Sequence, residues 1–212
     1  MSRRGMTLLE VVIAAAILAV VFAVAYALVA SAGSLSHSEL SLRDRQFRLH
    51  EFEDRLAAEL RESSPPLIRA TGFTDGSMPS ANQTVLVFAS ARDGSNLFRV
   101  QNAAPQWQRV VLYAARWDAT LKTGELRRYV LSPAPAAFTD PAQTPSVTVD
   151  ATTITAGGSS IPRTGGERVL LGMDYFRATI GGTTVSLDVA LQGSSIAKQT
   201  SINLQTGATG RN

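Results

Sequence analysis

An uncharged apolar run at residues 11–30 constrains this chain more than any other feature. Its twenty residues are all apolar or tyrosine, and Glu10 immediately precedes it. About 20 apolar residues are enough for a helix to cross roughly 30 Å of hydrocarbon. A carboxylate costs on the order of 2.5–3.5 kcal/mol at the centre of such a span and less near its ends. The position of Glu10 therefore calls for a compensating function.

Two interpretations of this segment follow from its flanking residues. Arg3 and Arg4 precede the run and no basic residue follows it before Arg43, so the positive-inside bias predicts a single signal anchor with a cytoplasmic N-terminus. The second interpretation is a cleaved secretory signal, because residues 30–32 read ASA, a peptidase-type sequence. Against a cleaved signal, the run exceeds the roughly 7–15 residues of a secretory core and begins beside an acidic residue.

A third interpretation rests on residues 3–10, RRGMTLLE. This stretch resembles the N-terminus of type IV pilin and pseudopilin precursors, in which a short basic leader ends in glycine and an apolar residue, threonine, leucine and glutamate follow. The resemblance implies that prepilin peptidase cleaves between Gly5 and Met6 and methylates the new amine of Met6. Methionine in place of the commoner phenylalanine is the one departure, and the first mature residue varies within the family.

The same resemblance implies a role for Glu10. Cleavage after Gly5 leaves a positive amine about one helical turn from Glu10. By family precedent, Glu10 of one subunit neutralises the Met6 amine of a neighbour, and Thr7 lies in the same assembly segment. A buried charge pair is costly as two separate ions but strongly coupled once paired. Glu10 would then fix the register in which subunit helices stack.

Residues 34–64 predict an amphipathic continuation of the helix. Residues 41–64 carry five basic and six acidic side chains. Apolar residues recur among them at helical spacing: Leu42, Leu49, Phe52, Leu56 and Leu60. Two consecutive prolines then end the pattern, because proline lacks an amide hydrogen and clashes with the preceding turn. We expect Leu49, Phe52 and Leu56 to pack on a sheet, and a free coiled coil is the alternative.

The remaining sequence, residues 65–212, indicates one β-rich domain. Its candidate strands are residues 84–90, 109–117, 125–132, 174–180, 184–192 and 201–205. Gly181-Gly182 predicts a hairpin turn between the fourth and fifth of these strands. Residues 132–166 are rich in Pro, Thr, Ser and Gly, and we expect a long irregular loop there with one short strand.

These features predict an α+β protein with the pilin fold. A long N-terminal helix, transmembrane in its first half, should pack on a C-terminal antiparallel sheet. The expected segments are a leader (1–5), a transmembrane and assembly helix (6–33), an amphipathic helix of the globular domain (34–64) and the β-rich domain (65–212).

Within this superfamily the chain most resembles the J-type minor pseudopilins of type II secretion systems. The likeness rests on the length, the absence of cysteine, the RVVLYAARWD and GELRRYV segments and the ERVLLGMDYFRATI stretch. It implies a single-pass inner-membrane protein with a periplasmic C-terminal domain, assembled near the pseudopilus tip. Implied partners are other minor and major pseudopilins or pilins, prepilin peptidase and an inner-membrane assembly platform. A minor pilin of a type IV pilus or of a DNA-uptake machine stays open, whereas Glu10 argues against the K-type tip subunit, which typically lacks this glutamate.

The sequence contains no recognisable catalytic, cofactor or metal motif. The absence of cysteine excludes disulfides and cysteine-based zinc sites. His37 and His50 are thirteen residues apart on the expected helix, so they do not form a metal pair. Asp93-Gly94 and its neighbours offer too few oxygens for calcium, which favours a plain turn. The net charge is +3, but the basic residues are scattered, which argues against nucleic-acid binding.

Two other functional classes remain open beside a filament subunit. An anchored ligand-binding domain would use exposed aromatic residues, and Trp107, Tyr113 and Trp117 are the place to look. Strand alternation puts Tyr113 and Trp117 on one face, which favours core packing instead. An exported enzyme is the third class, and no residues in the sequence point to its chemistry.

Overall fold

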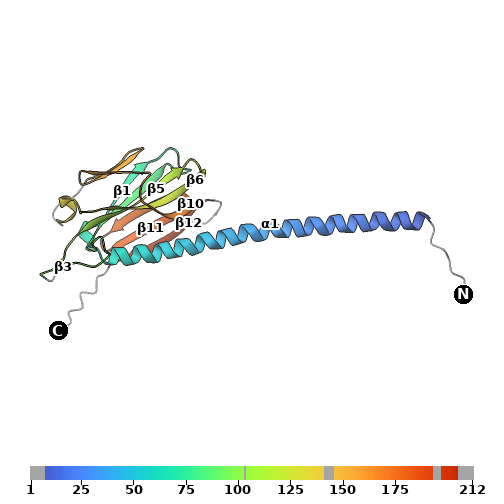
Figure 1. Ribbon diagram of the computed structural model, residues 1–212, viewed down its shortest axis with the longest axis horizontal. Helices are drawn as coiled ribbons and strands as arrows, with labels where there is room; N and C mark the ends of the chain where they lie inside the picture. Colours follow the sequence, from blue (N-terminus) through green and yellow to red (C-terminus); the bar gives the residue numbers. More distant parts are fainter. Residues whose placement is uncertain (1–7, 103, 141–145, 193–196, 205–212) are drawn as a thin grey trace, which may run out of the picture. The chain divides into compact units, whose positions relative to one another are not determined.

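The computed structural model describes residues 8–102, 104–140, 146–192 and 197–204 (Figure 1). The chain divides into two compact units, Met1–Asp44 and Arg45–Asn212. The first unit contributes the N-terminal part of helix α1 (Leu8–Arg61), and the second contains the end of α1 and all the strands. The predicted α+β class and antiparallel sheet are confirmed.

Helix α1 runs for 54 residues and ends close to the predicted stop. No proline occurs before Pro65, so nothing interrupts its backbone hydrogen bonds by removing a donor. Pro65 and Pro66 then form a short 3-10 turn, η1 (Pro65–Leu67). The turn redirects the chain into the first strand of the sheet.

Seven strands form one antiparallel sheet in the order β1-β2-β5-β6-β10-β11-β12. Their bounds are β1 (Arg69–Thr74), β2 (Asn82–Ser90), β5 (Arg109–Asp118), β6 (Thr123–Leu131), β10 (Glu167–Gly181), β11 (Thr184–Leu191) and β12 (Ala197–Asn203). Six of the seven lie where the sequence predicts strands. A hairpin joins β10 and β11 as expected, but its turn residues are Gly182 and Thr183, because Gly181 still pairs with Thr184. β1 was not predicted, because RATGFT has only one large apolar side chain.

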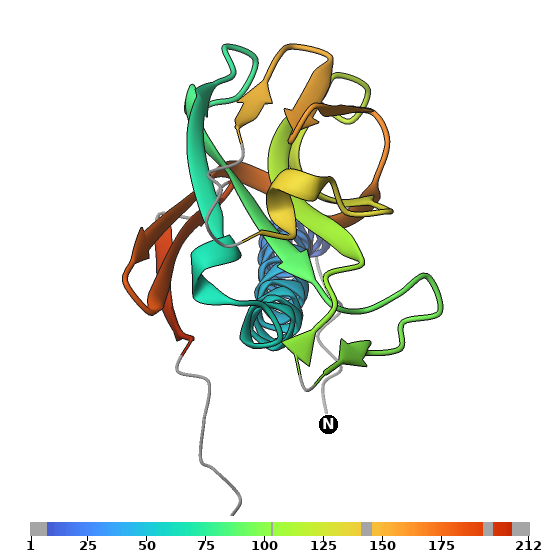
Figure 2. The ribbon, with the colours of Figure 1, turned by 90° about the vertical axis from the view of Figure 1, so that its left-hand side faces the viewer.

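Both faces of the central strands are covered. One face packs on Leu49, Phe52, Leu56 and Leu60 of α1. The other face carries Val85, Val87 and Leu112 into a second apolar cluster with Phe138 and Ile154. Every residue of β2 after Asn82 is therefore buried, as expected for a strand covered on both sides. Figure 2 shows the end of α1 below the sheet and the gold strands of the second layer above it.

The second layer corrects the expectation of an irregular loop at residues 132–166. This segment forms the 3-10 turn η2 (Ala136–Phe138) and a three-stranded sheet of β7 (Val147–Val149), β8 (Thr153–Ala156) and β9 (Ser159–Pro162). The strands are only three or four residues long and rich in Ser and Thr, so their alternation is too short to recognise in the sequence. Phe138 and Ile154 give the layer its apolar contact with the main sheet.

Strand β10 begins before the predicted strand at residue 174 and changes partners along its length. Residues 167–173 pair with β6 and residues 173–181 pair with β11, with register shifts around Gly172. Gly172 has φ +75°, which a residue with a side chain rarely adopts. The glycine therefore permits the irregularity at which β10 passes from one neighbour to the other.

A short two-stranded arm lies between β2 and β5 in the sequence. It consists of β3 (Val100–Gln101) and β4 (Ala104–Pro105).

Candidate functional site

The processing residues predicted from the sequence lie at the extreme N-terminus. Gly5, Met6 and Thr7 fall outside the described residues. Glu10 lies in the helical backbone of α1, and its side chain is also outside what the structure describes. Cleavage after Gly5 and pairing through Glu10 therefore stay predictions of the sequence.

The described part of α1 that follows Glu10 exposes apolar side chains on all sides. Phe22 and Tyr26 are 65% and 77% exposed, and Val12, Ile17 and Val29 are exposed as well. So many exposed apolar side chains indicate a surface that contacts other molecules. Within the described residues, no helix is long and apolar enough to cross a membrane. The transmembrane assignment of residues 6–33 thus stays a prediction.

The end of α1, in contrast, is part of the globular core. The structure places Leu49, Phe52 and Leu56 at 3%, 2% and 0% exposure. The Phe52 ring meets Tyr113 of β5 edge-on, with ring centroids 5.7 Å apart, and meets Phe176 of β10 at 6.3 Å. Such edge-to-face pairs add to the free energy of apolar burial. This packing fixes the last part of α1 against the sheet.

Charged contacts also join α1 to strands far away in the sequence. The Glu53 carboxylate accepts hydrogen bonds from Lys198 Nζ at 2.5 Å and Thr200 Oγ1 at 2.7 Å. Glu59 accepts one from the Tyr113 hydroxyl at 2.9 Å. Burial, followed by the nearby Glu59 charge, raises the pKa of Tyr113, so its hydroxyl stays protonated and donates. These contacts were not predicted from the sequence, although Glu53 and Glu59 flank the predicted apolar stripe.

A second charge cluster, with a buried carboxylate at its centre, lies on β5, β6 and β10. The fully buried Glu125 carboxylate contacts Arg116 Nε at 2.9 Å, Arg127 Nε at 2.6 Å and Arg168 Nε at 2.8 Å. Charged residues within an otherwise apolar strand, GELRRYV, were the available signal. Because each group has an opposite charge within hydrogen-bond reach, the cluster serves to hold three strands together.

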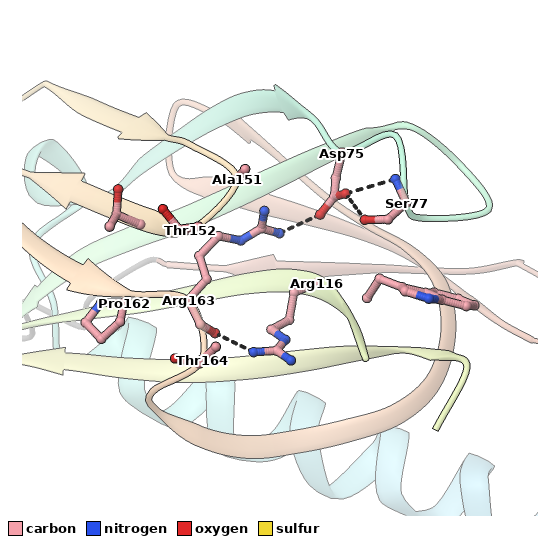
Figure 3. A pocket seen from close by; sticks show the side chains of 10 residues that line it. Asp75, Ser77, Arg116, Ala151, Thr152, Pro162, Arg163 and Thr164 are labelled. Carbon is pink, nitrogen blue, oxygen red and sulfur yellow. Dashed lines mark hydrogen bonds and ion pairs between the residues drawn. The ribbon is translucent and has the colours of Figure 1, made fainter. Parts of the chain in front are cut away.

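A cavity of about 540 Å³, whose lining includes the charged side chains of Asp75, Arg116 and Arg163, lies beside the second layer (Figure 3). Arg163 Nη2 donates to Asp75 Oδ2 at 2.6 Å and to the Ala115 carbonyl at 2.8 Å. Burial alone would raise the pKa of Asp75, but hydrogen bonds from Ser77 and Arg163 outweigh it and lower this pKa. The Asp75 and Arg163 charges cancel, so the arrangement suits a structural link between the layers better than capture of a charged ligand.

The other sequence candidates have structural roles in the domain. Tyr113 is buried and Trp117 packs against the same cluster, as alternation predicted. The Asp93 carboxylate accepts the amide hydrogens of Ser95 and Leu97 at 2.9 and 3.0 Å, which makes the Asp93-Gly94 segment a turn. His50 is exposed. Among the described residues, no three His, Cys, Asp or Glu side chains gather closely enough to hold a metal ion.

Comparison with known proteins gives one match. Residues 1–26 match the family model described as the prokaryotic N-terminal methylation motif. No curated protein and no solved structure matches the chain. The matched motif supports the type IV pilin and pseudopilin class and indicates a substrate of prepilin peptidase that assembles with other pilin-type subunits. It is typical of pilins that are anchored in a membrane.

Proposed function

We propose that this chain is a minor pseudopilin of a type II secretion system. Prepilin peptidase cleaves it between Gly5 and Met6 and methylates the amine of Met6, and the mature chain assembles in the tip region of the pseudopilus. The observation that carries the proposal is the methylation motif at residues 1–26, with Glu10 as the fifth mature residue. The pilin-like order of a long helix followed by an antiparallel sheet supports it.

In this proposal residues 6–33 have two successive environments. Before assembly they anchor the chain in the inner membrane, with the N-terminus cytoplasmic and the C-terminal domain periplasmic. After assembly the helices of neighbouring major and minor pseudopilins replace the lipid, with help from an inner-membrane assembly platform. The exposed side chains of residues such as Phe22 and Tyr26 support both states, because lipid tails and a neighbouring apolar helix both offer them an apolar environment.

Intact-mass measurement of the membrane-extracted chain tests the processing step. In cells that contain prepilin peptidase, we expect loss of residues 1–5 and the gain of one methyl group. Gly5→Leu should leave the precursor uncleaved, because the peptidase must approach the scissile backbone closely and glycine has no side chain. Ser2→Leu, within the same leader, is the matched control and should be processed. An uncleaved wild-type chain would indicate a simple anchor, and a chain beginning at Gly33 would indicate a secretory signal.

A minor pilin of a type IV pilus or DNA-uptake machine is the second candidate, because the same motif occurs at its N-terminus. A deletion strain separates the two. Loss of protein secretion with intact pili supports the pseudopilin, and loss of pili or of DNA uptake with intact secretion supports the pilin.

A further inference from the structure

Four arginines from four parts of the fold line one cavity beside the end of α1. Arg55 comes from α1, Arg92 follows β2, and Arg109 and Arg128 belong to β5 and β6. The cavity measures about 470 Å³, and Ala58, Glu59, Glu62 and Asn96 complete its lining. We name it the Arg109 pocket. All its residues belong to the unit Arg45–Asn212.

Three of these arginines have carboxylate partners. Arg55 forms two hydrogen bonds of 2.8 Å with Glu167. Arg92 pairs with Glu62, and Arg128 Nη2 lies 2.8 Å from Glu59 Oε1. The pocket and its neighbour Glu167 therefore hold four positive and three negative charges.

Arg109 is the arginine in excess. It donates to the Asn96 side-chain oxygen at 3.0 Å and to the Asp93 carbonyl at 3.4 Å, and both acceptors are neutral. Within the described part of the chain it forms no ion pair, and its Nε is buried without a hydrogen-bond partner. Burial and then the positive charge of Arg128 lower the pKa of Arg109. An arginine stays charged at neutral pH, so its surroundings favour an incoming anion.

An apolar loop adjoins the Arg109 pocket. Asn96, a pocket residue, is followed by Leu97 and Phe98, which are both exposed, and Phe98 pairs with Arg92 through a β-bridge. Val100, at the start of the β3–β4 arm, is exposed as well. Figure 2 shows this arm, in green, extending from the domain near the end of α1. A single positive charge next to exposed apolar side chains fits a partner in which one acidic residue has apolar neighbours.

We propose that the Arg109 pocket binds a carboxylate side chain from an acidic segment of a partner protein, whose apolar residues cover Leu97 and Phe98. A guanidinium presents paired donors that match a carboxylate. One excess positive charge is balanced by one carboxylate, whereas a doubly charged phosphate would leave an uncompensated negative charge beside Glu59 and Glu62. The proposal rests on these contacts and does not depend on processing at Gly5.

Peptide binding to the purified full-length chain in nonionic detergent tests the proposal. The probes are fluorescein-labelled acetyl-LFELF-amide and its glutamine counterpart, acetyl-LFQLF-amide, measured by fluorescence anisotropy. The neutral glutamine peptide partitions more strongly into detergent than the charged glutamate peptide, so the signal of each peptide in detergent without protein is subtracted before the two affinities are compared. We expect the glutamate peptide to bind about tenfold more tightly or better, the ratio for a charge-assisted hydrogen bond over a neutral one. Equal affinities overturn the proposal.

Two variants locate the effect at the pocket. Arg109→Gln should abolish the preference for glutamate, whereas Arg99→Gln, which removes an exposed arginine from the same loop, should keep it. Asn96→Asp is a second variant that preserves Arg109 and places a carboxylate at its 3.0 Å contact, so it should also abolish the preference. Asn96 has φ 62°, which aspartate tolerates nearly as well as asparagine. A preference that survives in folded Arg109→Gln and Asn96→Asp chains overturns the proposal.

Competition identifies the class of anion. Sodium acetate, inorganic phosphate and glycerophosphoglycerol, a soluble lipid headgroup, are compared at constant ionic strength. We expect acetate to displace the glutamate peptide at the lowest concentration of the three. Displacement at lower concentration by phosphate or by the headgroup would assign the pocket to phosphate ligands or to a membrane surface and overturn the carboxylate assignment.

Discussion

Glu125 and Asp75 show two ways in which this domain accommodates buried charge. Glu125 is fully buried and contacts three arginines, so its charge is over-compensated inside the sheet. The Asp75 side chain is 9% exposed and pairs with Arg163, which links the main sheet to the second layer. Removing one member of such an ion pair lowers the unfolding free energy by more than the intact pair contributes to it, because the remaining charge stays buried without compensation.

Replacing Glu125 with glutamine should destabilise the domain by about 3–5 kcal/mol, because three guanidiniums then lose their only shared carboxylate. The measurement is urea unfolding of the full chain in detergent, followed by circular dichroism of the β-rich domain. Glu51→Gln removes an exposed carboxylate on α1 and should change the unfolding free energy little. Equal stabilities of the two variants would show that Arg116, Arg127 and Arg168 are held by other contacts.

Asp75 should give the domain a dependence on acidic pH. Its pKa is lowered in the folded state, so its contribution is complete above the unfolded pKa of about 3.9 and disappears as the pH falls through the folded value. The stability difference between wild type and Asp75→Asn should therefore be constant from pH 7 to about pH 5 and shrink below about pH 4. Unfolding midpoints across this range provide the measurement. Asp54→Asn, which removes a carboxylate from an exposed position on α1, is the control for the loss of a surface charge.

Elements with long, regular patterns were predictable, and elements built from a few residues were not. The stripe Leu49, Phe52 and Leu56 and the apolar strands β2 and β5 follow from periodicity and composition, and the structure buries them. The three strands of the second layer are too short for an alternating pattern to be recognised in their sequences. The carboxylate contacts could not be predicted from the sequence for another reason. Glu53 and Lys198 lie 145 residues apart, and only the completed sheet brings them together.

The end of α1 provides a direct test of helix–sheet packing. Phe52→Ala and Leu56→Ala should each lower the unfolding free energy by about 2–5 kcal/mol, because each leaves a cavity in the apolar cluster. Phe47→Ala is the matched control, since Phe47 lies on the same helix and is 70% exposed, whereas Phe52 is 2% exposed. Urea unfolding in detergent measures all three. A cost below about half a kcal/mol at both Phe52 and Leu56 would contradict packing of the stripe on the sheet.

At the scale of the whole molecule, the two units have opposite surfaces. Most large apolar side chains of Arg45–Asn212 turn inward between layers of secondary structure, with Leu97, Phe98 and Val100 among the exceptions, whereas those of the described residues in Met1–Asp44 are exposed. Under the proposed function, a globular domain with its own apolar core and a helix that needs external cover suit a subunit that moves from a membrane into a filament. Under this proposal Glu10, at the beginning of the helix, distinguishes assembly from anchoring alone.

Replacing Glu10 with valine should therefore impair assembly and leave membrane insertion, cleavage and folding intact. Removal of a charge beside the apolar run makes insertion easier. The loss falls on the Met6 amine of a neighbouring subunit, and breaking one side of a buried pair typically costs about 3–5 kcal/mol. Glu10→Asp should be partly impaired, because the charge remains while its reach is shorter. Complementation of a deletion strain, at matched membrane levels and with crosslinking to partner subunits, compares wild type with both variants. Full complementation by Glu10→Val would contradict the pairing, and normal cleavage of an inactive Glu10→Val chain would assign the defect to assembly.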